Sequence, residues 1–179
     1  MEWENVVAGQ RADPAQINKI GNQVAKYKGL RLARRIVLTE AVSSITFDTD
    51  DDGKPLDSKL GGELVAVVKR PGASNNITLY ARLNSKTTSS FYWNTSYIAP
   101  TFIILGYIAV IGFVKCSIIS TMAGLIYDTV FAYNSATSVS SAAMYGGTRV
   151  AVDTIDTIQV YVPEGVLPIG TVIEWWERG

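Results

Sequence analysis

The spacing of apolar residues from Arg31 onward predicts a series of short strands. Apolar and polar residues alternate with the period of two that places one face of a strand against a core. Turn-forming residues punctuate the series, as at Pro71-Gly72 and at Pro163-Glu164-Gly165. Outside the middle of the chain, the predicted strands cover residues 31–40, 44–48, 63–70, 76–83, 91–93, 155–162 and 169–176.

The middle of the chain, Ile98 to Tyr127, carries one formal charge, Lys115. A membrane-spanning helix needs about 20 apolar residues, whereas the longest apolar run, Phe102 to Val114, has thirteen. A lysine within a span costs about 2.5–3.5 kcal/mol on insertion scales. The many β-branched and aromatic residues suit strands. We therefore predict three strands, and keep a membrane helix as the competing interpretation; the strands cover residues 101–106, 107–122 (with an internal turn or bulge) and 125–133.

Three stretches between the strands are predicted to be irregular. Asp50 to Pro55 reads as a turn in which Gly53 takes a positive φ. Ser135 to Ser141 is rich in Ser, Thr and Ala and is predicted to be a loop, and Gly146-Gly147 is predicted to form another turn. A succession of strands without intervening helices predicts an all-β fold with antiparallel sheets, either a β-sandwich or a barrel.

Residues 1–29 follow a different pattern and are predicted to form an arm and a short α-helix ahead of a β-sandwich domain at residues 30–179. The arm, Met1 to Arg11, either docks on a neighbouring molecule or frays. Asp13 can cap a helix that starts at Pro14 and ends at Gly29. One face of this helix carries an apolar seam, namely Ile17, Ile20, Val24 and Tyr27. The seam predicts oligomerisation through a short coiled coil, or packing of the helix on its own sandwich.

Composition excludes several classes of function. Sixteen basic and sixteen acidic residues cancel, which argues against a nucleic-acid partner. The chain has no His and a single Cys, Cys116, so the usual catalytic base and the usual zinc ligands are missing. We therefore expect neither an enzyme nor a metal or other cofactor. The first residues, MEWENVVAGQ, lack the basic and apolar regions of a signal peptide, which predicts synthesis in the cytoplasm.

One acidic motif has the spacing of a calcium loop. Asp48, Asp50 and Asp52 alternate before Gly53, as oxygen ligands do around a calcium ion. The twelfth position, where such loops have a bidentate Glu, is Lys59. This favours a solvated hairpin turn, and leaves calcium binding at Asp48 to Asp52 open.

Aromatic and basic residues supply two further candidate surfaces. Tyr92, Trp93 and Tyr97 are candidate contacts for a host surface glycan, although aromatic residues on antiparallel sheets commonly fill the core. Trp175 and Trp176 are adjacent in a predicted strand, so one of them should be buried in the core or in an interface. The basic residues Lys26, Lys28, Arg31, Arg34 and Arg35 favour a helix end and an exposed strand face over an anion-binding site.

The two ends of the chain resemble bacteriophage virion proteins. The start, VVAGQRADPAQINKIGNQVAKYK, is similar to the N-terminal segment of tail-fibre, head-fibre and baseplate proteins, in which a G-x-x-A-D-x-x-Q-(I/V)-N stretch precedes a short helix. The end, GVLPIGTVIEWWERG, resembles the last strand of small phage β-sandwich head domains, which finish as (F/L)P-x-G-T-x-I-E-(V/I)-(W/Y)-G-(R/V). Trp176-Glu177 departs from that pattern, while the matching residues are Pro168, Gly170, Thr171, Ile173, Glu174 and Trp175.

This resemblance implies a jelly-roll or galectin-like sandwich, assembly as a homotrimer, and a structural role in the virion. On that interpretation the N-terminal arm binds other virion proteins and the sandwich faces outward. The chain would be a tail, baseplate or fibre component that takes part in host attachment. It would neither bind nucleic acid nor insert into a membrane. The alternatives are a capsid decoration or head-fibre protein that binds no receptor, and a bacterial carbohydrate-binding module. The resemblance carries over no catalytic residue.

Overall fold

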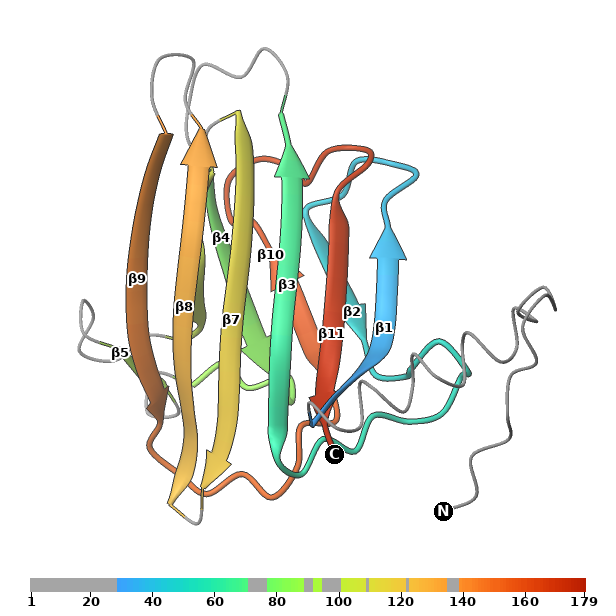
Figure 1. Cartoon of the computed structure of the whole chain (residues 1–179), viewed down its shortest axis with the longest axis vertical. Helices are drawn as coiled ribbons and strands as arrows, with labels where there is room; N and C mark the ends of the chain where they lie inside the picture. Colours follow the sequence, from blue (N-terminus) through green and yellow to red (C-terminus); the bar gives the residue numbers. More distant parts are fainter. Residues whose placement is uncertain are drawn as a thin grey trace, which may run out of the picture.

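The computed structural model describes residues 29–70, 77–88, 92–94, 101–108, 110–121, 123–134 and 139–179. In this part the chain folds into two antiparallel β-sheets that pack face to face as a sandwich (Figure 1). The prediction of an all-β, antiparallel sandwich is therefore confirmed. The predicted helix and its seam of Ile17, Ile20, Val24 and Tyr27 lie outside the described residues, as does most of the predicted N-terminal unit at 1–29.

Within the described residues the larger sheet has seven strands and the smaller has four, and every neighbouring pair runs antiparallel. In spatial order the large sheet consists of β1 (Leu30–Val37), β11 (Val172–Arg178), β3 (Gly61–Lys69), β7 (Ile111–Thr121), β8 (Gly124–Asn134), β9 (Val139–Thr148) and β5 (Tyr92–Asn94). The small sheet consists of β2 (Ser44–Phe47), β10 (Ile158–Tyr161), β4 (Ile77–Leu83) and β6 (Ile103–Ile108). The first and last long strands of the domain, β1 and β11, are neighbours in the large sheet.

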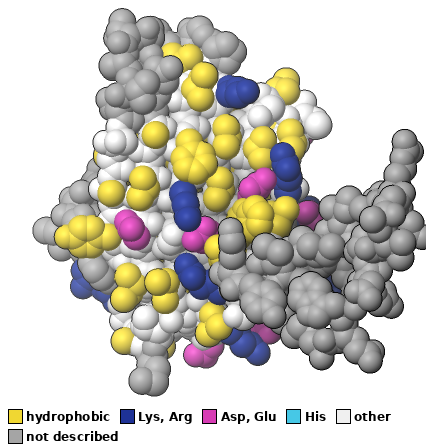
Figure 2. Space-filling view, in the orientation of Figure 1, with side chains coloured by type: hydrophobic (Ala, Val, Ile, Leu, Met, Phe, Trp, Pro, Cys, Tyr) yellow, Lys and Arg dark blue, Asp and Glu magenta, His cyan; other side chains and the backbone are white. Residues whose placement is uncertain are grey.

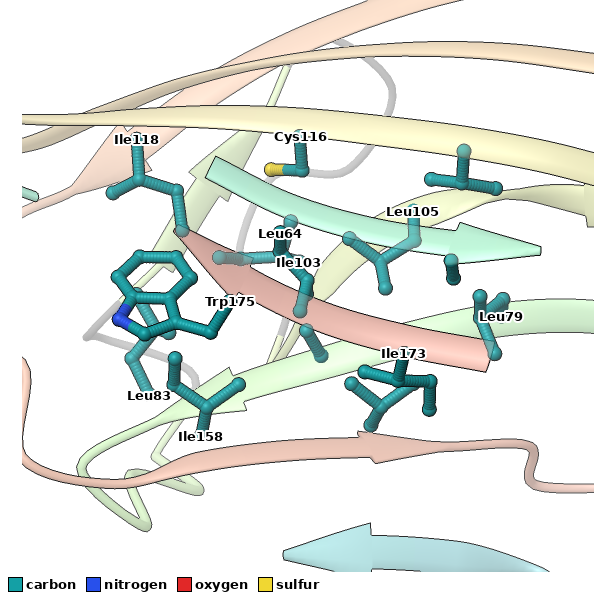
Figure 3. Packing of buried hydrophobic residues seen from close by; sticks show 14 of the residues in the cluster. Leu64, Leu79, Leu83, Ile103, Leu105, Cys116, Ile118, Ile158, Ile173 and Trp175 are labelled. Carbon is teal, nitrogen blue, oxygen red and sulfur yellow. The ribbon is translucent and has the colours of Figure 1, made fainter. Parts of the chain in front are cut away.

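The core lies between the two sheets and takes every second residue of the strands that line it. Trp175 is its largest fully buried side chain, and Leu64, Leu79, Ile103 and Ile158 from both sheets surround the same space (Figure 3). The Trp175 indole donates a hydrogen bond of 3.0 Å to the Ser58 hydroxyl. Space for the ring depends on Gly62, because a Cβ there would lie 2.6 Å from the indole.

The nearly uncharged middle of the chain forms three strands, as predicted. β6, β7 and β8 occupy it, and the break inside the predicted strand 107–122 falls between Ile108 and Ile111. Lys115 lies on the outer face of the large sheet, where its ammonium is 2.9 Å from the Glu63 carboxylate. Among the described residues, no helix is both long enough and apolar enough to cross a membrane.

Two predictions of irregular structure are wrong, because strand β9 was not foreseen. Val139 to Ser141 belong to β9 rather than to a loop, and Gly146-Gly147 lie inside the strand rather than in a turn. Both glycines pair with Tyr127 and Ile126 of β8 on one side and with β5 on the other. The sequence of β9, VSSAAMYGGT, has a weak intrinsic preference for strands, and pairing with its neighbours outweighs it.

The two ends of the sandwich domain lie side by side. The backbone N–H of Gly179 donates a hydrogen bond of 3.2 Å to the carbonyl of Gly29. Gly29 therefore lies at the end of the sandwich where the C-terminus also lies, and the connections β1–β2 and β10–β11 lie at the opposite end (Figure 1).

Candidate functional site

The outer face of the large sheet exposes a set of large apolar side chains. On β7, β8 and β9 the residues that alternate with the core positions point away from the core. Five of them keep between 45% and 59% of their surface exposed, namely Phe113, Ile119, Ile126, Val130 and Tyr145. Figure 2 shows hydrophobic side chains spread across this face, with charged side chains between them. We call the outer face of β7, β8 and β9 the apolar half.

The register of the strands groups these side chains into two clusters. Ile119 lies directly opposite Ile126, and Tyr145 is diagonal to Ile126 across the β8–β9 pair. Phe113 is diagonal to Val130 across the β7–β8 pair. Side chains at such positions touch or nearly touch, so the apolar half carries two hydrophobic patches.

The neighbouring strands β1, β11 and β3 carry ion pairs on the same face, one of them with Lys115 of β7, and we call the outer face of β1, β11 and β3 the charged half. Glu63 lies 2.9 Å from Lys115 and 3.7 Å from Arg178, and Glu174 lies 3.5 Å from Arg35. Both carboxylates are less than one fifth exposed, whereas Lys115 and Arg35 are about half exposed. The same strands carry half-buried apolar residues, among them Val65 and Trp176, and the Trp176 indole donates a hydrogen bond of 3.1 Å to the Glu174 carboxylate.

The acidic turn that resembles a calcium loop is closed by its own backbone. Asp50 is 3% exposed. Its Oδ1 accepts hydrogen bonds from the backbone N–H groups of Asp52 (3.0 Å) and Lys54 (2.9 Å), and its Oδ2 lies 3.4 Å from the Arg31 guanidinium. Burial alone would raise the pKa of Asp50, but these donors lower it below its usual value. The described part of the chain holds no group of three or more acidic or Cys side chains arranged for a metal ion.

The basic residues of β1 are paired within the protein. Arg31 lies 2.7 Å from Glu177, and Arg34 lies 3.4 Å from Asp51 and donates to the carbonyl of Asp50. Together with the Arg35–Glu174 pair, these contacts fit the interpretation of an exposed strand face. Lys26 and Lys28 lie outside the described residues.

The structure removes Tyr92 from the candidate glycan contacts. Its side chain is 0% exposed, and its hydroxyl accepts a hydrogen bond from the backbone N–H of Leu83 and donates one to the Leu83 carbonyl. Burial raises the pKa of Tyr92 to about 12, and no face of the ring is open to a sugar. The side chain of Trp93 and all of Tyr97 lie outside the described residues. Trp175 is buried in the core and Trp176 lies on the outer face, as their adjacency predicts.

A hollow with a volume of about 440 Å³ lies between the turn after β4 and the connection from β9 to β10. Asn84 holds the two together, because its side-chain amide donates to the Thr154 carbonyl (2.7 Å) and accepts from the Asp156 N–H (3.0 Å). Asn84 and Ser85 both take the positive φ of a tight turn. The hollow lies at the end of the sandwich where the C-terminus also lies (Figure 1).

Sequence reasoning missed both the apolar half and an aromatic cluster on the small sheet. The apolar half could be found only by knowing the register, because half of the apolar residues in β7 and β8 face outward and half face inward. The cluster joins Tyr80, Phe102 and Tyr161, which lie in three separate parts of the chain.

Neither a scan against protein-family models nor a search of curated proteins gave a match to this sequence.

Proposed function

We propose that this chain is a structural protein of a bacteriophage particle, a homotrimeric tail, baseplate or fibre component that takes part in attachment to the host. The observation that carries the proposal is the apolar half, which lies outside a core that is already complete. A monomer in water rarely keeps several large apolar side chains together on its surface, and such patches mark protein interfaces. Identical subunits are the commonest partners for such a surface.

A trimer suits a chain that offers two different apolar surfaces. In a closed ring of three, each subunit presents one surface to one neighbour and a different surface to the other. The apolar half is the first surface, and the seam of Ile17, Ile20, Val24 and Tyr27, predicted from the sequence, is the second. The seam is too short to hold an isolated coiled coil together, so packing on a sheet face would stabilise it.

The position of Gly29 supports an outward-facing sandwich. Gly29, which follows the predicted arm and helix in the sequence, lies beside Gly179. If the arm binds other virion proteins, that end faces the particle, and the opposite end with the exposed Val166 and Ile169 faces the surroundings. This arrangement fits an appendage that meets the host surface.

The proposal is tested by following the chain in particles. A tag placed after Gly179 should sediment with the DNA-containing particles that the encoding strain releases on lysis, because the C-terminus lies at the surface of the sandwich. The matched variant, a tagged chain of residues 30–179, should stay with free protein, because it lacks the arm. Recovery of both chains among free proteins would contradict the virion assignment.

The same particles separate the alternatives. A capsid decoration or head-fibre protein without receptor binding should remain on particles from which tails have been removed, and free sandwich should leave adsorption to the host unchanged. A component used in attachment should lower adsorption when free sandwich is added in excess.

A further inference from the structure

The outer face of the small sheet differs from every other surface described above. On β2, β10 and β4 the residues of this face that alternate with the core positions are polar or aromatic, namely Ser44, Thr46, Thr78, Tyr80, Arg82, Gln159 and Tyr161. The register places Tyr161 between Ser44 and Tyr80, and Gln159 between Thr46 and Arg82. Two adjacent rows, one aromatic and one rich in hydrogen-bonding groups, therefore cross three strands.

Three aromatic rings and one cation make the centre of this face. The ring centroid of Tyr80 is 4.2 Å from that of Phe102 and 5.5 Å from that of Tyr161. The guanidinium carbon of Arg82 lies 4.5 Å from the centroid of the Tyr161 ring. All four side chains are half-buried. Aromatic rings held in place by such contacts lose little conformational freedom when a ligand stacks on them.

Among the described residues, Arg82 on this face has no acidic partner. Arg82 donates to the carbonyl of Thr101 (3.3 Å) and to the side-chain oxygen of Gln159 (3.4 Å). Within the described part of the chain, no carboxylate lies within ion-pair distance of Arg82, and none of the outward residues of β2, β4 and β10 is acidic. On the large sheet, by contrast, Arg35, Lys115 and Arg178 each have a carboxylate partner.

We propose that the outer face of β2, β10 and β4 binds an acidic saccharide, a sugar unit that carries a carboxylate. The apolar face of the sugar ring would pack against the exposed parts of the Tyr80 and Tyr161 rings. The carboxylate would pair with Arg82, which supplies the complementary charge and a planar array of donors. The hydroxyl groups of the sugar would bond to Gln159 and Thr46, which lie beside Arg82 in the same row.

The inference rests on the proposed attachment role for its biological meaning, because an acidic glycan on a host surface is the receptor it implies. Its chemistry can be tested without particles. Failure of sugar binding would leave the virion assignment standing, and failure of the tagged chain to enter particles would leave the sugar site standing.

The test is a titration of the full chain, followed by NMR chemical shifts, with 3′-sialyllactose, with a disaccharide that contains glucuronic acid, and with neutral lactose. At least one acidic sugar should bind about tenfold more tightly than lactose, as expected for one desolvated charge-assisted contact. Arg82→Gln should remove that preference. Tyr161→Ser should weaken binding of the acidic sugar by about tenfold, because the contact with the aromatic ring is lost. Tyr161→Phe keeps the ring and should bind as the unchanged chain does.

The matched control for the charge is Lys54→Gln, which removes an exposed cation from a turn away from this face. It should leave binding unchanged. The proposal is overturned if neither acidic sugar binds at about 10 mM, if lactose binds as tightly as the acidic sugars, or if Arg82→Gln binds as Lys54→Gln does while both variants unfold at the same temperature as the unchanged chain.

Discussion

The two outer faces of this sandwich are built on one core but differ in chemistry. The large sheet exposes Phe113, Ile126 and Val130 beside ion pairs in which each cation has a carboxylate partner. The small sheet presents Tyr80 and Tyr161, together with Arg82, which forms no ion pair with any of the described residues. The first pattern suits another protein surface, whose apolar groups replace water. The second suits a polar ligand with a flat face and a negative charge.

The difference shows how one fold can separate assembly from recognition. In a β-sandwich, alternate residues of every strand are committed to the core, and the remaining ones are available for function. Because the two sheets face opposite ways, one outer face can be covered by neighbouring subunits while the other stays open. Substitutions can change the outer face of the large sheet, the outer face of the small sheet, or the core that supports both.

The largest effect is expected from Gly62→Ala, which should damage both faces together. A Cβ at this position would lie 2.6 Å from the Trp175 ring and would also meet the backbone of Trp176. Overpacking of this kind costs about 1–3 kcal/mol, and more where backbone cannot move. Urea unfolding should show the loss. Gly179→Ala, where nothing lies within 4 Å of the added methyl group, should have no effect, and equal stability of the two variants would contradict the packing described for Trp175.

The next effect concerns assembly alone. Phe113→Lys places a charge in the apolar half, where Phe113 is 45% exposed, and should dissociate the oligomer while the folded subunit keeps its stability. The control is Val37→Lys, which changes a residue that is 52% exposed at the edge strand β1 of the same sheet. Sedimentation velocity should give monomers for the first variant and unchanged oligomers for the second. Dissociation by both variants would mean that the apolar half is not the interface.

The acidic turn predicts a dependence of stability on pH. The pKa of Asp50 is lowered in the folded protein, so its contribution is present above the unfolded pKa of about 3.9 and is lost as the pH falls through the folded value. Asp50→Asn should therefore lower the free energy of unfolding at pH 7, by about 1–3 kcal/mol, and the gap to the unchanged chain should narrow towards pH 2. A gap that stays constant with pH would contradict the role given to the ionised carboxylate. The matched change on an exposed neighbour is Asp52→Asn.

Much of the sandwich could be predicted from sequence, because the alternation within β3, β4 and β10 reports directly which residues face the core. Strand β9 could not, since its Ser, Ala and Gly residues owe their conformation to the strands on both sides. The candidate sites were harder to predict from the sequence, because they too depend on contacts between separate parts of the chain. Tyrosine is a residue type that often contacts sugars. Only the hydrogen bond of the Tyr92 hydroxyl with the buried Leu83 backbone shows that this side chain fills the core. Tyr80 and Tyr161 are far apart in the chain and meet only through the register of β4 with β10.

The smallest expected effect is the reactivity of the buried Cys116 thiol in the folded chain. Burial raises the pKa of the Cys116 thiol to about 12. The folded chain should therefore show almost no reaction with a disulfide reagent at pH 8, and one thiol should react per chain in denaturant. Rapid reaction of the folded chain would mean that the space between the sheets opens readily.

The central claim is that the apolar half joins copies of this chain, and the mass of the full chain in solution tests it most directly. Sedimentation equilibrium at micromolar concentration should give three times the chain mass of 19.4 kDa. A mass of 19.4 kDa at every concentration up to the highest that stays in solution would contradict the claim.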